Sequence, residues 1–305
     1  NDGYGGSVDD GYGGNADDGY GGTEPSRNWT QLTDGPIAVS SHTAVTVNDK
    51  MYVYGGAVDI FTRVKALHEY DPANDSWTQL ADGPVDISNH SAVTINNKMY
   101  VYGGENGFVV SSKNTLYEYD PATNSWNQLA DGPDVSASHT AVAINGKMIV
   151  YGGSQRNTNQ YEYDPSTDSW AQLANGPVGI SNHSAVVIND KMYVYGGFNT
   201  SNVRINSLFE YDRSTDTWVQ LADGPIGISR HTAVTVDNKM VVYGGFDGTN
   251  SFKTLYEYDP AADSWTQLGD GPVAIGDHSA ITINNKMYVY GGFTDSSVKS
   301  LYIVE

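Results

Sequence analysis

The hydrophobic and polar positions along this chain follow one pattern that returns six times. In each unit an alternating run such as HTAVTV (42–47) precedes a polar pair, an apolar run such as MYVY (51–54) and a glycine pair. A variable segment, a tyrosine-rich run and a run that begins with tryptophan complete the unit. Runs of four to six residues with a period of two predict strands rather than helices. Each unit is therefore expected to form four short β-strands.

The strictest part of the repeat begins at a histidine, and successive histidines lie 44 to 49 residues apart. They are His42, His90, His139, His183, His231 and His278. A four-stranded sheet of this size cannot bury both of its apolar faces alone, so the copies are expected to stack face to face in a closed ring. The predicted fold class is all-β: a six-bladed β-propeller with four antiparallel strands per blade.

The two ends of the chain are predicted to share one blade. The last unit stops after its third strand, at 301–305 (LYIVE), and the missing fourth strand has its counterpart at 28–32 (NWTQL). Pairing these segments would close the ring without a covalent bond. The chain is thus divided into an acidic, Gly/Tyr-rich octapeptide-repeat tail at 1–23 and a propeller at 24–305.

Turn chemistry and small residues support the same fold. The pair Asn48-Asp49 and its counterparts are expected to form two-residue hairpin turns, because Asn, Asp and Gly tolerate the left-handed backbone that such turns need. The first strand of every unit carries an alanine, as at Ala44. Small side chains suit the narrow inner end of a wedge-shaped blade.

The glycine pairs, each followed at set distances by a Tyr-Asp and a tryptophan, resemble the Kelch repeat. The pairs begin at Gly55, Gly103, Gly152, Gly196, Gly244 and Gly291. The resemblance covers essentially residues 24 to 305 and implies the propeller fold. It does not imply one function, because propellers of this type include enzymes, adaptors and carbohydrate-binding modules.

Composition and charge remove several classes of partner. With 16 basic and 36 acidic residues the net charge is −20, which repels nucleic acid and anionic lipid surfaces. No run is long and apolar enough to insert into a membrane. The chain has no cysteine, so disulfides and thiol chemistry are excluded. Because the sequence begins at Asn1 rather than methionine, it is expected to be either an exported, processed protein or a trimmed piece, and an extracellular location is predicted.

The repeated histidines are expected to be structural, for example through a hydrogen bond to the backbone of a neighbouring blade. Six-fold symmetry would hold them too far apart to share one ion, so no metal and no cofactor are predicted. The units differ at the residue before each histidine, where Arg230 and Asp277 occupy the same position in adjacent blades. These two side chains could pair across the channel mouth or contact a ligand.

The segments between the second and third strands vary most and are expected to share a face with the connections between blades. They carry Phe108, Phe198, Phe246 and Phe293, together with basic residues that include Arg156 and Arg204. Exposed aromatic side chains on one face would suit a protein partner or a sugar ring. They could equally fold back over the blades.

The segment 1–22 repeats every eight residues as NDGYGGSV, DDGYGGNA and DDGYGG, with five Asp, nine Gly and no basic residue. It cannot bury a core, and a linker is its simplest interpretation. Its regularly spaced tyrosines could instead dock into a neighbouring copy and link subunits. These are Tyr4, Tyr12 and Tyr20.

Three functional hypotheses follow from these patterns. The first is a non-enzymatic extracellular binding or scaffold module that contacts a protein partner or further copies of itself. The second is a glycan-binding module. The third is a Kelch enzyme: resemblance to the galactose oxidase type lacks the cysteine that its cofactor needs, and resemblance to sialate epimerases is weakened by the scarcity of arginine. No unit combines a nucleophile, a base and an orienting group, so no enzyme is predicted.

Overall fold

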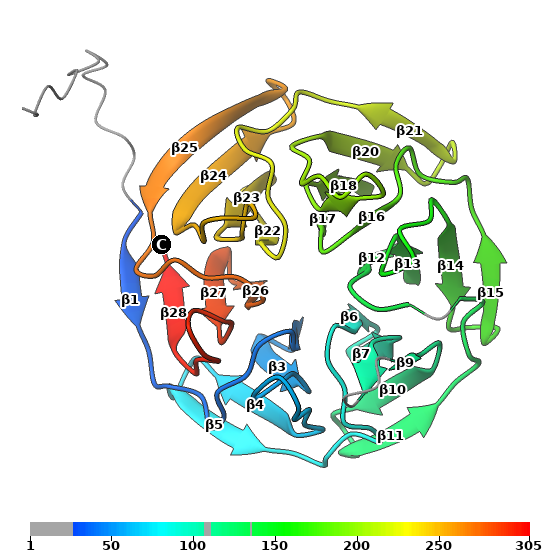
Figure 1. The fold of residues 1–305 in the computed structure, drawn as a ribbon. Coiled ribbons are helices and arrows are strands. Elements are labelled where there is room, and N and C mark those ends of the chain that lie inside the picture. Colours follow the sequence, from blue (N-terminus) through cyan, green and yellow to red (C-terminus); the bar gives the residue numbers. More distant parts are fainter. Residues whose placement is uncertain (1–26, 107–110, 135) are drawn as a thin grey trace, which may run out of the picture.

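A computed structural model describes residues 27–106, 111–134 and 136–305, and every regular element in these ranges is a strand. Six four-stranded antiparallel sheets radiate from a central axis like the blades of a propeller (Figure 1). The predicted fold class is confirmed. The described residues include no helix that could span a membrane.

The blades follow the chain in order, each from its innermost to its outermost strand. Blade 1 contains β2 (Thr43–Val47), β3 (Lys50–Tyr54), β4 (Leu67–Asp71) and β5 (Ser76–Gln79). Blade 2 contains β6 (Ser91–Ile95), β7 (Lys98–Tyr102), β10 (Leu116–Asp120) and β11 (Ser125–Gln128). Blade 3 contains β12 (Thr140–Ile144), β13 (Lys147–Tyr151), β14 (Gln160–Asp164) and β15 (Ser169–Gln172).

The second half of the ring repeats this order. Blade 4 contains β17 (Ser184–Ile188), β18 (Lys191–Tyr195), β20 (Leu208–Asp212) and β21 (Thr217–Gln220). Blade 5 contains β22 (Thr232–Val236), β23 (Lys239–Tyr243), β24 (Thr254–Asp259) and β25 (Ser264–Asp270). Blade 6 contains β26 (Ser279–Ile283), β27 (Lys286–Tyr290), β28 (Leu301–Val304) and β1 (Trp29–Gln31). Short extra pairs are β8 (Glu105–Asn106) with β9 (Ser111–Ser112), and β16 (Ile180–Ser181) with β19 (Phe198–Asn199).

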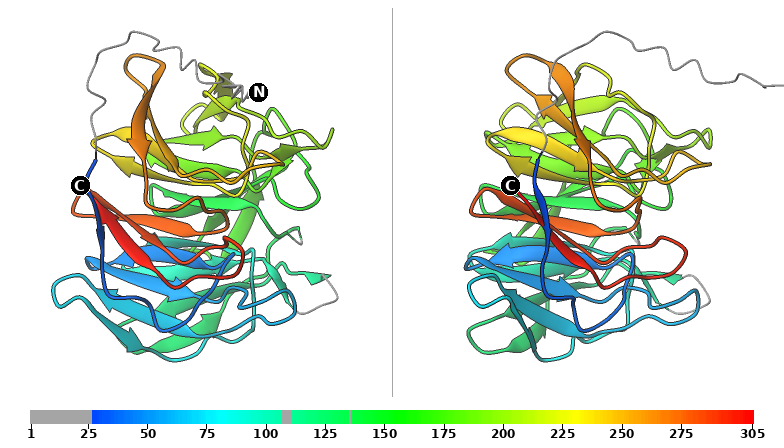
Figure 2. Two further views of the ribbon diagram at one scale, coloured as in Figure 1. Left: turned by 60° about the vertical axis from the view of Figure 1, so that its left-hand side comes forward. Right: turned by 90° about the vertical axis from the view of Figure 1, so that its left-hand side faces the viewer.

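The ring closes as predicted, between the two ends of the described chain. β1 runs antiparallel to β28, with Trp29 opposite Val304 and Gln31 opposite Tyr302. Figure 2 shows β1 lying along the outer edge of blade 6, beside β28. The indole of Trp29 also packs on Tyr243 of blade 5, with ring centroids 4.8 Å apart. The N-terminal strand therefore completes blade 6 and fastens it to blade 5.

Two faces of the propeller follow from the connections. The hairpin face carries the turns that join the first and second strands and those that join the third and fourth. The loop face carries the segments after the glycine pairs and the connections between blades. The hairpin turns have the expected left-handed backbone, with φ of 49° at Asn48 and 59° at Asp49.

Aromatic side chains fill the gaps between blades. Trp77 of blade 1 lies between Tyr70 of its own blade and Tyr290 of blade 6, at 5.0 Å from each ring centroid. Its indole N–H donates to the carbonyl of Thr33 at 3.1 Å. Gly35 lies under the ring of Tyr290, where a Cβ would approach it to 2.2 Å. The Asp-Gly-Pro turns are thus shaped to receive a tyrosine ring.

Candidate functional site

The channel along the axis is lined in layers by the first strands. From the loop face inward, the wall consists of six small or charged residues, six histidines, six Ser or Thr hydroxyls and six alanines. Below them, Val, Ile, Ala and Thr residues line a further volume of about 370 Å³. The predicted small residue at the narrow inner end of each wedge is confirmed, because Ala44 and its five counterparts lie on the channel wall.

A closed ring of backbone hydrogen bonds forms the channel mouth. Each residue before a histidine donates its N–H to the carbonyl of the same residue in the preceding blade, at 2.7–2.9 Å. All six have a left-handed backbone, with φ between 53° and 61°. The members are Ser41, Asn89, Ser138, Asn182, Arg230 and Asp277. Because every carbonyl of the ring accepts such a bond, recognition at the mouth depends on the side chains.

The histidines fasten neighbouring blades through hydrogen bonds. His90 Nε2 lies 2.8 Å from Thr43 Oγ1 of the preceding blade, and the series closes between His42 and Ser279 at 2.5 Å. The partner of each Nε2 is a hydroxyl, because the residue after each histidine is Ser or Thr. Burial lowers the pKa of His90 to about 3, so the ring is neutral at physiological pH. Among the described residues, no cluster of His, Asp and Glu could hold a metal ion.

Arg230 and Asp277 pair at the mouth as the sequence suggested. Arg230 Nη1 lies 3.5 Å from Asp277 Oδ2, and the mouth encloses about 120 Å³. The Arg230 side chain is 49% exposed, whereas that of Asp277 is 19% exposed. Burial raises the pKa of Asp277, and the charge of Arg230 opposes this rise. The pair gives one side of an otherwise uncharged mouth two opposite charges.

Three of the predicted aromatic residues occupy one position in consecutive blades. Phe198, Phe246 and Phe293 directly follow the glycine pairs of blades 4, 5 and 6. Each bridges to a residue two positions before the histidine of its own blade, on the loop face. Phe293 is 41% exposed, whereas Phe198 and Phe246 are half-buried and do not project freely. Phe108 and the tail tyrosines Tyr4, Tyr12 and Tyr20 lie outside the described residues.

Two arginines turn this aromatic row into an alternating stack, which we call the Arg–Phe ladder: Arg156, Phe198, Arg204 and Phe246. The guanidinium of Arg156 lies 4.4 Å from the centre of the Phe198 ring. That of Arg204 lies between two rings, 5.0 Å from Phe198 and 4.9 Å from Phe246. The ladder thus connects the loops of blades 3, 4 and 5.

Each arginine of the ladder is also held by hydrogen bonds. Arg156 Nη1 donates to the carbonyl of Asn199 at 3.1 Å and to Asn202 Oδ1 at 2.7 Å. Arg204 Nε donates to Ser229 Oγ at 3.2 Å. These bonds fix the guanidinium planes against the rings. Sequence reasoning named both arginines as loop residues but missed the stack, whose one local signal is the six-residue spacing from Phe198 to Arg204.

The ladder arginines differ from the other arginines in their charge balance. Of the six in the described ranges, Arg27, Arg63, Arg213 and Arg230 each lie within 4.0 Å of a carboxylate. Arg156 and Arg204 have no such partner among the described residues. Asp247 senses the charge of Arg204, but its Oδ1 accepts the backbone N–H groups of Thr249 and Asn250, each at 2.7 Å. In a chain of net charge −20, two arginines without an ion pair are a distinctive feature.

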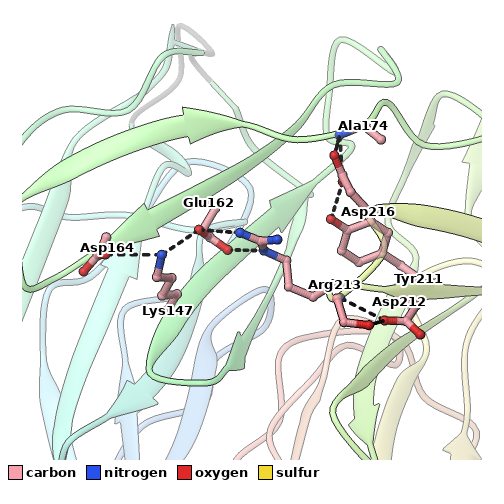
Figure 3. Close-up of polar contacts among 9 residues, drawn as sticks. Lys147, Glu162, Asp164, Ala174, Tyr211, Asp212, Arg213 and Asp216 are labelled. Atoms are coloured by element: carbon pink, nitrogen blue, oxygen red, sulfur yellow. Dashed lines mark hydrogen bonds and ion pairs between the residues drawn. The ribbon is translucent and has the colours of Figure 1, made fainter.

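A second departure from the repeat lies on the hairpin face, between blades 3 and 4 (Figure 3). Arg213 stands where most units have proline and donates two hydrogen bonds to Glu162, at 2.5 and 3.1 Å. Lys147 contacts the same carboxylate at 3.0 Å and Asp164 at 3.3 Å. A cavity of about 460 Å³ lies beside this cluster. Because its charges neutralise one another, we interpret the cluster as a fastener between blades rather than as a binding site.

Comparison with known proteins agrees with this geometry. A family model described as the KLHDC2/KLHL20/DRC7 Kelch-repeats domain matches residues 4–175 and 138–305. The chain belongs to the Kelch-repeat family. No curated protein is significantly similar in sequence. A solved structure of YjhT is similar to this Kelch propeller with a TM-score of 0.80 and 21% identity, covering 90% of this chain and 99% of that one. At this identity the similarity supports the fold alone.

Proposed function

We propose that this Kelch propeller is a binding scaffold that holds protein partners, among them further copies of itself, on its loop face. The observation that carries the proposal is the Arg–Phe ladder, where aromatic and cationic groups from three loops form one surface. Aromatic and arginine side chains contribute most of the binding energy in protein interfaces. The family supports the proposal at a coarser level, because Kelch propellers commonly mediate protein contacts.

Self-assembly through the N-terminal repeats is the second part of the proposal. Residues 1–22 carry five Asp and three Tyr, and no strand of the closed propeller draws on them, so we propose them as the contact segment. Deleting residues 1–22 should reduce the particle size measured by light scattering at high protein concentration. An unchanged size distribution would remove the tail from the assembly.

We also propose that the protein acts outside the cell and without catalysis. A chain without cysteine has no thiol that an oxidising compartment would alter. The channel histidines are buried and neutral, so they are poorly placed as a general base. Fractionation of the native source tests the location, since recovery in the intracellular fraction alone contradicts it. Turnover of a sugar or peptide substrate that depends on a channel residue would contradict the absence of catalysis.

A glycan is the alternative ligand of the same face. Phe293 is 41% exposed beside the mouth, and an exposed aromatic ring can stack on a sugar. A glycan array probed with the propeller and with Phe198→Ala, Phe246→Ala and Phe293→Ala variants distinguishes the two ligands. A signal that all three variants lose favours the glycan, whereas no signal favours the protein scaffold.

A further inference from the structure

We propose that the Arg–Phe ladder is the acceptor for the Asp-Gly-Tyr repeats at residues 1–22 of a second copy of this chain. The inference rests on the proposed function and deepens it, because it names both surfaces of the contact. The ladder supplies cationic edges, and the tail supplies carboxylates and phenol rings. The proposal concerns only these two parts of the chain.

The geometry of the ladder selects an anionic ligand. The Arg204 guanidinium carbon lies 5.0 Å from the centre of the Phe198 ring and 4.9 Å from that of Phe246, so the groups it can offer to a polar ligand are its in-plane N–H donors. Its Nε donates to Ser229 and its Nη1 lies beside Gly248, while neither terminal nitrogen has a hydrogen-bond acceptor among the described residues. A carboxylate matches such an edge with two parallel hydrogen bonds. The flanking rings reduce hydration at this edge and strengthen the pairing.

The charge of the chain favours its own tail as that ligand. Arg156 and Arg204 are the two arginines of the described ranges without a carboxylate within 4.0 Å, whereas the tail has five Asp and no basic residue. Each tail repeat places a tyrosine two residues after an aspartate. An aspartate at the guanidinium edge would therefore bring a phenol ring within reach of Arg156 or Phe246, at either end of the stack.

The position of Arg27 favours docking into a second copy. Arg27 donates to Glu257 at 3.0 Å, and Glu257 also pairs with Lys239, which directly follows a hairpin turn. The described chain therefore begins on the hairpin face. The ladder lies beyond the other end of the blades, after Tyr195 and Tyr243. A tail that starts on one face reaches the loop face of a following copy directly but must pass around the rim to reach its own.

Docking of this kind joins unlike surfaces and does not close on itself. Each copy would donate a tail from its hairpin face and accept one on its loop face, so copies would add head to tail. Assembly should then grow with concentration rather than stop at a dimer. The tail carries three similar repeats, so altering one repeat should weaken association only about 1.5-fold, the statistical ratio of three repeats to two.

Sedimentation velocity of the full chain over a range of concentrations tests the acceptor. Arg204→Gln should weaken association about tenfold, the loss expected for one charge-assisted contact. Arg63→Gln is the matched control, because Arg63 occupies the same position in blade 1 and bonds Ser88 at 3.0 Å, but no aromatic ring of the described residues stacks on it. Arg204→Lys keeps the charge and should also weaken association, since it loses the planar edge. Equal effects of Arg204→Gln and Arg63→Gln would overturn the proposal.

A mixing experiment tests whether docking occurs between copies. The acceptor-deficient chain carries Arg156→Gln and Arg204→Gln, and the donor-deficient chain carries Asn at its five tail aspartates. Each should remain monomeric alone, while their mixture should form one-to-one pairs that cannot extend. Monomers in the mixture, with assembly of the unaltered chain, would overturn docking in a second copy. If the unaltered chain does not assemble at all, the proposed self-assembly fails as well, so the two failures are distinguishable.

Discussion

Single substitutions in the repeat are compensated by residues of the next blade. In blades 1, 2 and 4 a tyrosine of the second strand donates to the glutamate of the third strand, as Tyr52 does to Glu69 at 2.5 Å. Blades 3 and 5 have Ile149 and Val241 at that position. There an arginine of the following blade takes over: Arg213 bonds Glu162, and Arg27 bonds Glu257. This glutamate, buried in blade 3 and partly buried in the other four, therefore keeps a donor at its second oxygen in all five blades.

This exchange predicts a rescue. Arg213→Pro, which restores the residue of most units, should lower the free energy of unfolding by about 1–2 kcal/mol, because Glu162 stays buried with one donor fewer. Adding Ile149→Tyr should recover much of that loss by supplying a phenol. Urea denaturation of the two single variants and the double variant gives the coupling energy. Additive effects would contradict the compensation.

The histidine ring predicts loss of stability in acid. Burial lowers the pKa of each ring histidine from 6.5 to about 3. The unfolded chain binds these protons below pH 6.5, whereas the folded chain does not. The histidine contribution to the free energy of unfolding is therefore fully present above pH 6.5 and is lost as the pH drops towards 3. Each histidine contributes up to about 1.4 kcal/mol per pH unit in this window.

Urea unfolding midpoints measured between pH 7 and pH 4 test this dependence. His139→Asn should be less stable at pH 7 but should show a shallower decline, since one titrating group is missing. Asp71, Asp120 and Asp164, whose pKa values are lowered mainly by hydrogen bonds from backbone or side-chain groups, add to the decline only near pH 4 and below. A midpoint that does not change between pH 6.5 and 5 would contradict the neutral histidine ring.

At the scale of elements, strands and hairpins could be read from local residues, but the loop face could not. Asn48-Asp49 specifies its turn within two residues, and a tryptophan such as Trp77 marks the fourth strand of every unit. The Arg–Phe ladder instead needs three loops from different blades, and no local pattern brings Arg156 to Phe198. The ring of residues before the histidines could be predicted only in part. Asn89 and Asp277 are residue types that favour a left-handed backbone, but Arg230 is not, so the sequence does not show that all six positions need this conformation.

The hairpin turns give a prediction at this scale. Asn97, with φ of 60°, should tolerate Gly, as blade 3 does at Gly146. Asn97→Val should cost about 1–2 kcal/mol, because a branched side chain resists the left-handed backbone. Asn127→Val on the exposed outer strand β11 is the matched control and should be neutral or slightly stabilising. Thermal denaturation of the three variants checks the order, and equal melting temperatures for both Val variants would contradict it.

The molecule as a whole could be predicted from its sequence because the repeat imposes the same four strands six times. Nothing but a ring lets all six copies bury both faces, and the fourth-strand match at Trp29 indicated where the ring closes. The partner could not be predicted in this way. It depends on the few residues that depart from the repeat, and their meaning appears only when the blades stand side by side.

Ring closure by β1 makes a final prediction that separates the tail from the propeller. Residues 1–22 precede every described contact, so their deletion should leave the free energy of unfolding unchanged at concentrations where the chain is monomeric. Deleting residues 1–32 also removes β1, exposes the edge of β28 and takes Trp29 from Tyr243. This should lower the free energy of unfolding by at least about 3 kcal/mol, the usual cost of losing a packed tryptophan.

Because an unpaired strand edge can pair with other chains, the longer deletion should also aggregate. Urea denaturation and light scattering of both deletions decide the matter: equal stability of the two would mean that the propeller does not depend on its N-terminal strand.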